Sequence, residues 1–224
     1  MTNTFIDIET LPQQPENEAK ALIAETIKAP AAMKKAETIE AWHNGEGKYE
    51  GEKDKLIEKT YRDTSFDGGK GELCSIAFSD NGALGVLSQS LKDGASERDL
   101  LLFLRDSLDG IKNLTFVGHN IRFDLKFLHH RFIINNINPN FRIPFSGRHG
   151  SDFYCTMEAW AGFKERISQD NLCKALGIEG KKEGVSGSTV YDYFKDGKID
   201  EIEKYNIDDV ETVIKMYNRL NFKG

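Results

Sequence analysis

Between residues 72 and 132 the chain alternates β-favouring runs with segments of helical periodicity, and this order constrains the fold more than any other feature. Apolar runs at 72–79 and 83–88 are separated by Asp80-Asn81-Gly82, and Asn-Gly between two apolar runs is a strong signal for a β-hairpin. A further apolar run, 114–117, predicts another strand. Strands of this kind need helices to cover them.

Two helices are predicted beside these strands. Ser96, followed by Asp99, has the form of a capping box at a helix start, and leucines then recur at helical spacing. Gly118 ends the strand at 114–117. The next apolar residues recur as on one face of a helix: Ile121, Leu125, Leu128 and Phe132. A strand, a turn and a helix in this order are typical of α/β folds.

Two more strands are predicted, one before and one after residues 72–132. Helices are predicted between the first strand and residue 72, and after the last strand. Residues 4–8 predict a short strand, and Pro12 ends it. Residues 13–70 are rich in alanine, lysine and glutamate and are interrupted by glycines, which predicts a largely helical insertion. We expect this insertion to be either a peripheral addition or a functional lid. A short strand is predicted near 151–155, and helices over 156–163, 168–176, 188–194 and 199–220.

The charge balance limits what the chain can bind. Thirty Lys and Arg residues against thirty-six Asp and Glu give a net charge of −6, so the chain has no overall charge that would make it coat a polyanion. A cluster of carboxylates that binds divalent cations contributes to such a count, so nucleic acid stays a candidate substrate. The three cysteines are far apart and match neither a disulfide framework nor a zinc-site spacing.

The hydropathy pattern indicates neither a membrane-spanning segment nor a secretory signal. No apolar stretch approaches the roughly 20 residues that a membrane span needs, and the first residues lack both a basic leader and a long apolar segment. We therefore expect no membrane partner and a cytoplasmic location.

Asp7 and Glu9 form the first candidate site. Alternate residues of a strand point to the same side, so both carboxylates face one way while Ile6 and Ile8 face the other. Two acids in one small space are costly unless a cation or water compensates their charge. By itself the pair is compatible with a metal site or with solvated acids at a strand end.

Asp124 lies in the first turn or so of the helix that follows strand 114–117, close to Asn120. Polar residues at this position are either helix caps or parts of a site. The loops after parallel strands build the sites of open α/β sheets. Asp7, Glu9 and Asp124 therefore converge if strand 114–117 lies parallel to the first strand.

Tyr205 and Asp209 form the third candidate. They lie four residues apart on one face of the last predicted helix, next to its apolar stripe, so both would meet the sheet. A core tyrosine beside a solvated acid is the alternative interpretation. The order and context of all three candidates make coincidence much less plausible than any one of them alone.

These three segments resemble the motifs of a known family. Residues 5–10, 118–128 and 205–210 resemble the exonuclease motifs of DnaQ-like, DEDD-type 3′-5′ exonucleases, in the subgroup that carries a tyrosine. The chain is most similar to the proofreading exonuclease domain of family-B DNA polymerases and its stand-alone relatives, over residues 4–220 apart from the 13–70 insertion. The resemblance implies a ribonuclease-H-like α/β fold, a mixed five-stranded sheet with helices on both faces, in a single domain of residues 1–224.

The resemblance also implies roles for individual residues. Asp7, Glu9, Asp124 and Asp209 match the four metal-binding acids, and Tyr205 matches the tyrosine that orients the attacking water. Carboxylate oxygens without histidine or thiolate favour Mg²⁺ or Mn²⁺. Two such ions, roughly 4 Å apart, would stabilise the incoming and departing oxygens of a phosphodiester attack.

Softer assignments concern the substrate. Thr10, Leu11 and Asn120 lie where the family approaches the terminal nucleotide, and Asp152 resembles an acid between the second and third motifs that usually supports the site. Phe123, near the second motif, could stack on a base. Further side chains could contact phosphates or stack on bases: Arg122, Lys126, Arg142, Arg148, His149 and Phe145.

The expected function is hydrolysis of single-stranded DNA from the 3′ end with release of nucleoside 5′-monophosphates. We expect no polymerase segment beside the motifs, and therefore expect a proofreading role to need a separate polymerase or a replication or repair protein as partner. Three alternatives stay open: a 3′-5′ exoribonuclease with the same site, a catalytically idle nucleic-acid-binding protein, and a phosphatase with an aspartyl nucleophile. The last would require a second Asp where Glu9 stands.

Overall fold

The computed structural model describes residues 2–80, 85–180 and 184–223. The chain divides into two compact units. The larger unit combines residues 1–10 with residues 73–224, and the smaller unit comprises residues 11–72. Each unit is described below by itself.

The larger unit is built around a mixed five-stranded sheet in the order β3-β2-β1-β4-β5. Strand β1 runs parallel to β4, with Thr2 opposite Leu114, and β4 runs parallel to β5, whereas β2 and β3 are antiparallel. The strands are β1 (Thr2–Leu11), β2 (Glu72–Asp80), β3 (Leu87–Ser90), β4 (Leu114–Gly118) and β5 (Phe153–Cys155). The parallel pairing of the first strand with the strand at 114–117 is thereby confirmed.

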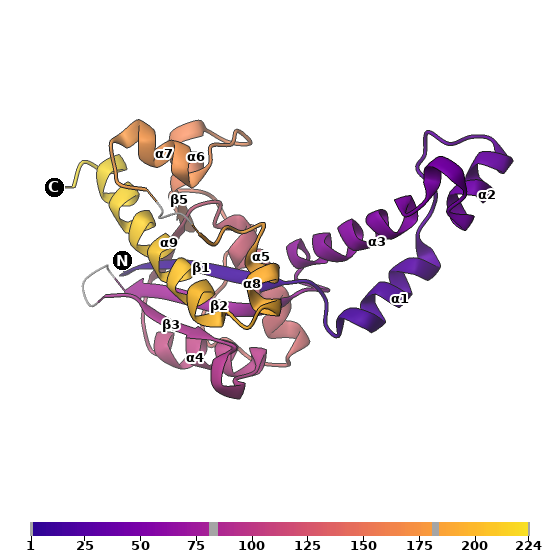
Figure 1. Cartoon of the computed structure of the whole chain (residues 1–224). Coiled ribbons are helices and arrows are strands. Elements are labelled where there is room, and N and C mark those ends of the chain that lie inside the picture. Colours follow the sequence, from indigo (N-terminus) through magenta and orange to yellow (C-terminus); the bar gives the residue numbers. More distant parts are fainter. Residues whose placement is uncertain (1, 81–84, 181–183, 224) are drawn as a thin grey trace. The chain divides into compact units, whose positions relative to one another are not determined.

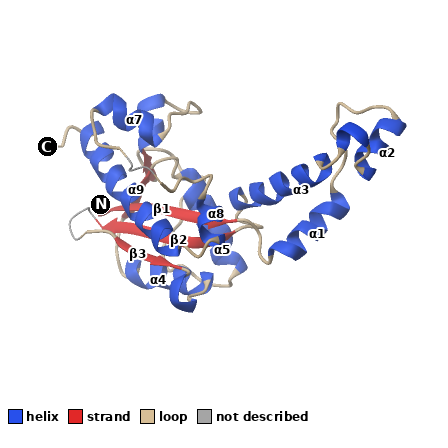
Figure 2. Cartoon of the chain, in the orientation of Figure 1, coloured by secondary structure: helices blue, strands red, loops and turns tan. Residues whose placement is uncertain are grey.

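Helices cover the sheet, as Figures 1 and 2 show. The first of them, α4, begins at Ser96 with the predicted capping box, in which the Ser96 and Asp99 side chains each bond the other's backbone N–H. The elements are η3 (Lys92–Gly94), α4 (Glu97–Leu108), α5 (Arg122–Ile134), α6 (Thr156–Ala161), α7 (Gln169–Leu176), α8 (Val190–Lys195) and α9 (Ile199–Leu220).

The two faces of the sheet bury two separate apolar layers, and β1 contributes to both. Ile6 and Ile8 pack in the layer that contains the apolar residues of α4 and α5. Phe5 packs in the other layer, against Val210 and Val213 of α9. Figure 1 shows α9 lying across that face of the sheet. This is the fold that the resemblance implies: a ribonuclease-H-like mixed sheet with helices on both faces.

Several element boundaries differ from the sequence-based expectation. Strand β1 extends to Leu11 rather than ending near residue 8. The expected strand at 83–88 is found at 87–90, and Gly85 before it has a φ of +86°, which extended backbone does not allow. The predicted Asn81-Gly82 turn and residues 83–84 lie outside the described residues. Helix α6 ends at Ala161 rather than at 163, because Gly162 has a φ of +91°.

The smaller unit is helical in the part of the chain described (Figure 2). Its elements are α1 (Glu16–Thr26), α2 (Ala36–Asn44), η1 (Gly47–Tyr49), α3 (Glu52–Asp63) and η2 (Thr64–Phe66). Trp42 and Tyr61 are fully buried, and Lys20 joins α1 to α3 through an ion pair with Glu58 of 2.5 Å. The insertion expected over residues 13–70 lies within this unit, while its membership in a single exonuclease domain stays a prediction.

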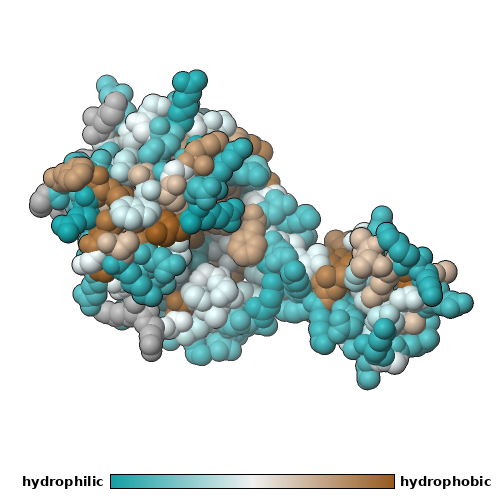
Figure 3. All heavy atoms as spheres, turned by 90° about the horizontal axis from the view of Figure 1, so that it is seen from above, coloured by the Kyte–Doolittle hydropathy of each residue, from teal (hydrophilic) through white to brown (hydrophobic). Residues whose placement is uncertain are grey.

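Asp, Glu, Lys and Arg make up 29% of the sequence, and such residues mostly lie on protein surfaces. The face seen in Figure 3 is largely hydrophilic, with hydrophobic groups in between. Among the described residues, none of the helices combines the length and the apolar composition required to cross a membrane.

Candidate active site

Strand β1 places two carboxylates on the side of the sheet that faces α9. Asp7 is half-buried and Glu9 is 8% exposed. Together with the buried Asp209 of α9, they offer oxygen atoms that all lie within 4.8 Å of one another. Among the described residues, Asp7, Glu9 and Asp209 thus form one compact group, called the acidic cluster below, although they come from opposite ends of the sequence.

Helix α9 supplies Asp209 because its apolar stripe, with Val210, Val213 and Met216, packs on the sheet. Tyr205 lies one turn earlier on the same helix. Burial is the main cause that raises the pKa of Tyr205 well above its usual range, and the negative charges of Asp209, Glu9 and Asp7 and a hydrogen bond with Asp209 add to it. The phenol therefore stays protonated and can donate a hydrogen bond beside the acids.

Asp124 approaches the cluster from α5. Its Oδ1 accepts a hydrogen bond of 3.2 Å from the backbone N–H of Ile8, between the two acids of β1. Asp124 is 4% exposed, and burial, with the negative charge of Asp209 as a further cause, raises its pKa to about 8. A glycine suits the tight turn before α5, because a Cβ at Gly118 would lie 2.5 Å from Cδ1 of the fully buried Ile121 and 3.1 Å from the backbone oxygen of Ile6.

The four acids fit a divalent cation site by their chemistry. All donors are carboxylate oxygens, which Mg²⁺ and Mn²⁺ prefer. The negative charge of Asp209 raises the pKa of both Asp124 and Tyr205, which means that these groups repel added negative charge. A bound cation would relieve this repulsion.

Two buried polar residues beside the acids escaped the sequence analysis. Nδ2 of Asn206 donates a hydrogen bond of 2.7 Å to Oδ2 of Asp7, and Nε2 of Gln169, on α7, donates one of 3.3 Å to the backbone oxygen of Asp209. Asn206 is fully buried and Gln169 is 7% exposed. The position of Asn206 between Tyr205 and Asp209, next to the apolar stripe of α9, could have indicated a buried polar residue near the acids.

The residues expected to touch the terminal nucleotide have different environments. Thr10 is half-buried at the end of the larger unit, whereas Leu11 is fully buried and begins the smaller unit. Asn120 is exposed in the turn before α5, with a φ of +60°. Phe123 packs against Phe127, with ring centroids 5.7 Å apart, at the margin of the core. Their contacts with a substrate stay predictions.

Asp152 interacts within its own loop. It accepts a hydrogen bond of 2.7 Å from the backbone N–H of Arg148, and it forms an ion pair of 3.1 Å with Arg142. These contacts lower the pKa of Asp152, the bond from Arg148 most of all. The contacts that the structure gives Asp152 lie with this loop and not with the four acids, so its supporting role stays a prediction.

Arg122, two residues before Asp124, is held by contacts within the protein. Nε of Arg122 bonds Oε1 of Glu158 at 2.6 Å, and its guanidinium lies 4.5 Å from the ring centroid of Phe153. A hollow of about 470 Å³ opens beside it, with Phe163 at its margin 71% exposed. The hollow is lined by Arg122, Ser146, Gly147, Arg148, His149, Glu158 and Phe163. Arg148 is exposed, as is Lys126 on α5.

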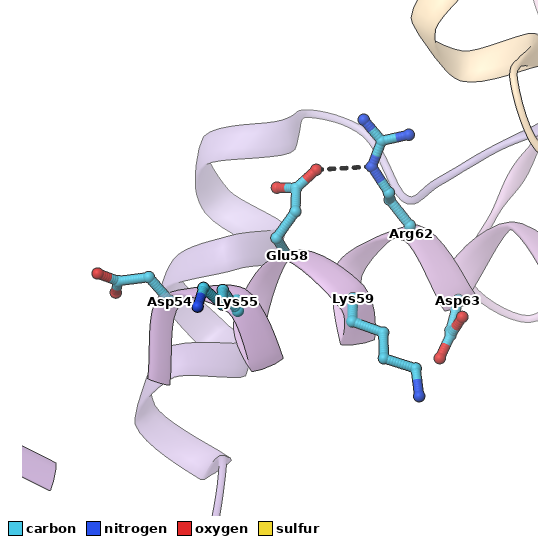
Figure 4. Close-up of a pocket in the computed structure, with 6 residues that line it drawn as sticks. All are labelled: Asp54, Lys55, Glu58, Lys59, Arg62 and Asp63. Atoms are coloured by element: carbon cyan, nitrogen blue, oxygen red, sulfur yellow. Dashed lines mark hydrogen bonds and ion pairs between the residues drawn. The ribbon is translucent and has the colours of Figure 1, made fainter. Parts of the chain in front are cut away.

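A second hollow, of about 560 Å³, belongs to the smaller unit and runs along α3. Figure 4 shows Glu58 and Arg62 joined on one side of the helix, while Lys59 and Asp63 extend from another side. Its lining balances three acids against three bases: Asp54, Lys55, Glu58, Lys59, Arg62 and Asp63. This balance favours a solvated helix surface over a site for a charged ligand.

Comparisons with known proteins agree with this geometry. A family model described as "Predicted 3'-5' exonuclease related to the exonuclease domain of PolB" matches residues 73–223. Among solved structures, the chain is similar to the family B DNA polymerase from the hyperthermophilic archaeon Pyrobaculum calidifontis, with a TM-score of 0.60 and 13% identity. The match covers 99% of this chain but only 24% of the polymerase chain, and at this identity it shows the fold alone. A search of curated proteins finds no match.

Proposed function

The chain belongs to the family of predicted 3′-5′ exonucleases related to the exonuclease domain of PolB, and from this premise we propose that it hydrolyses single-stranded DNA from the 3′ end and releases nucleoside 5′-monophosphates. The convergence of Asp7, Glu9 and Asp209, with oxygens within 4.8 Å of one another, carries this proposal. Asp124, which accepts a hydrogen bond from the backbone N–H of Ile8 between Asp7 and Glu9, supports the proposal as the expected fourth acid.

The four acids are the residues that would hold Mg²⁺ or Mn²⁺. Such ions supply a lowered pKa for the attacking water and compensate the charge that develops on the departing oxygen. Tyr205 keeps its proton because its pKa is raised and its O–H is hydrogen-bonded with Asp209, so the phenol oxygen is held beside the acids, where it can accept a hydrogen bond from the attacking water and orient it. Burial of Glu9, Asp124 and Asp209 keeps these side chains in few orientations and limits access of bulk water.

The hollow beside Arg122 supports a single strand as the substrate. It lies at the first turn of α5, which also carries Asp124, and it combines cationic side chains with the exposed ring of Phe163. Phosphates pair with Arg148, and a base can stack on an exposed aromatic ring without regard to sequence. A separate polymerase or repair protein would supply the strand end in a proofreading role.

The test is digestion of end-labelled single-stranded DNA, double-stranded DNA and RNA with Mg²⁺, with Mn²⁺ or with a chelator. We expect stepwise shortening of single-stranded DNA from the 3′ end that depends on the cation. Asp209→Asn should abolish it. Asp208→Asn is the matched control, because Asp208 is the adjacent carboxylate on α9 and lies outside the acidic cluster, while its backbone oxygen bonds Oγ1 of Thr212.

The outcomes separate the proposal from its alternatives. Turnover by Asp209→Asn at the wild-type rate in Mg²⁺ would refute the assignment of the site. Degradation of RNA in preference to DNA would keep the site and replace the substrate. Binding of single strands without release of nucleotides would identify a catalytically idle binding protein.

A further inference from the structure

Asn206 links the acidic cluster to the interior of the sheet. Its Nδ2 donates a hydrogen bond of 2.7 Å to Oδ2 of Asp7, and its Oδ1 accepts one of 2.8 Å from Oγ of Ser75. Asn206 and Ser75 are both fully buried. Three side chains, from β2, α9 and β1, therefore form one continuous hydrogen-bonded chain that ends on an acid of the cluster.

The chemistry of these groups gives the chain a direction. A carboxylate can only accept hydrogen bonds, so the amide nitrogen of Asn206 has to face Asp7. The amide oxygen then faces Ser75, whose hydroxyl donates to it. Ser75 thus selects the orientation of the amide, and the amide in turn engages a single oxygen of Asp7.

This bond restricts a side chain that is otherwise easy to rotate. The terminal torsion of aspartate is broad and roughly two-fold, so burial alone does not fix which oxygen faces the other acids. Groups that hydrogen-bond the ligands of a metal site orient those ligands. We propose that Asn206, held by Ser75, is a positioning residue for Asp7 that fixes the orientation in which its carboxylate meets a divalent cation. The inference rests on the proposed function.

The alternative role for Asn206 is a structural tie between α9 and the sheet. The protein contains a tie of that kind nearby, which provides a matched control. Ser90 lies opposite Ser75 in the β2–β3 register, is equally buried, and donates a hydrogen bond of 3.2 Å to Oε2 of Glu203 on α9. The Ser90 bond fastens the same helix to the same sheet without contacting the acidic cluster.

The test measures Mn²⁺ binding by isothermal titration calorimetry in the wild type and in Asn206→Ala, Ser75→Ala and Ser90→Ala, with circular dichroism and unfolding in chelator to check that each is folded. Asn206→Ala should raise the Kd for Mn²⁺ about 10- to 100-fold. Ser75→Ala should raise it about 3- to 10-fold, because the amide loses the contact that orients it. Ser90→Ala should leave the Kd unchanged. Excess Mn²⁺ should restore nucleotide release by Asn206→Ala, with little change in KM for DNA.

A wild-type Kd in folded Asn206→Ala would overturn the inference, and so would an equal effect of Ser90→Ala and Ser75→Ala. If Asn206→Ala does not fold, Ser75→Ala against Ser90→Ala decides. Failure of the wild type itself to bind Mn²⁺ would overturn the proposed function and the inference with it, so the two failures are distinguishable.

Discussion

Replacing Asp124 by asparagine should stabilise the metal-free protein at neutral pH. Burial, with the charge of Asp209 as a further cause, raises the pKa of Asp124 from 3.8 to about 8. In the unfolded chain the carboxyl group loses its proton near its ordinary pKa, so between about pH 4 and pH 8 the unfolded state binds fewer protons than the folded state. The free energy of unfolding therefore falls as the pH rises through this window, and it levels off above it.

The size of the effect follows from the proton that the folded state retains. At pH 7 the proton bound by Asp124 in the folded state lowers the free energy of unfolding by about 4 kcal/mol relative to its value below about pH 4, since each pH unit in this window corresponds to 1.36 kcal/mol. The introduced amide has the shape of the carboxyl group, and its oxygen can still accept the bond of 3.2 Å from Ile8. Its NH₂ group costs about 1–3 kcal/mol when it is buried without a partner. We expect a net gain of about 1–3 kcal/mol at pH 7 and no gain near pH 4.

The assay is urea unfolding in chelator at several pH values from about 4.5 to about 8, which spans the titration window. Asp208→Asn serves as the control, because Asp208 is half-buried and outside the acidic cluster. The reasoning fails if Asp124→Asn is less stable than the wild type at pH 7, or if its advantage does not shrink as the pH is lowered.

Four further outcomes are expected. Asp7→Ala should lose nucleotide release in Mg²⁺ with an unchanged circular dichroism spectrum, and measurable wild-type turnover would contradict its role. Tyr205→Phe should lower kcat about 100-fold with a similar KM in steady-state kinetics, because it removes only the hydroxyl group that orients the water; an unchanged kcat argues against that role. Phe163→Ala should raise the KM for single-stranded DNA about 5-fold or more through loss of stacking, and equal KM values would exclude it from the strand path. Ser96→Ala should lower the free energy of unfolding by about 1 kcal/mol through loss of the cap of α4 and leave the rate unchanged.

Local periodicity predicted most of the fold, and together with the resemblance of three segments to exonuclease motifs it pointed to Asp7, Glu9 and Asp209, which the structure brings together. The side of the strand that Asp7 shares with Glu9 follows from the two-residue repeat of β1, and Ile6 and Ile8 do pack in the opposite layer. The long final helix was predicted at its observed bounds, Ile199–Leu220, from the stop at Gly197 and the apolar stripe of Ile207, Val210, Ile214 and Tyr217. Patterns of this kind depend only on residues close together in the sequence.

Partners of polar side chains depend on tertiary structure and could not be predicted in the same way. Ser75 and Asn206 are 131 residues apart, and their bond requires that β2 lie beside β1 under α9. Arg122 had the sequence context of a phosphate ligand, but Glu158, 36 residues later, takes its Nε and one terminal nitrogen. Phe123 likewise packs against Phe127 one turn on, since α5 turns that face towards the core.

The position of β1 explains how acids from both faces of the sheet come near one another. Phe5 is held in the layer beneath α9, so Asp7 and Glu9 on the same side extend towards Asp209. Asp124 belongs to α5, which packs on the opposite face, and its Oδ1 accepts a hydrogen bond from the backbone N–H of Ile8, between Asp7 and Glu9. A backbone N–H of a strand lies near the plane of the sheet, between its two faces, whereas a side chain is confined to one face. The N–H of Ile8 can therefore be bonded by an acid from the face opposite to Asp7 and Glu9.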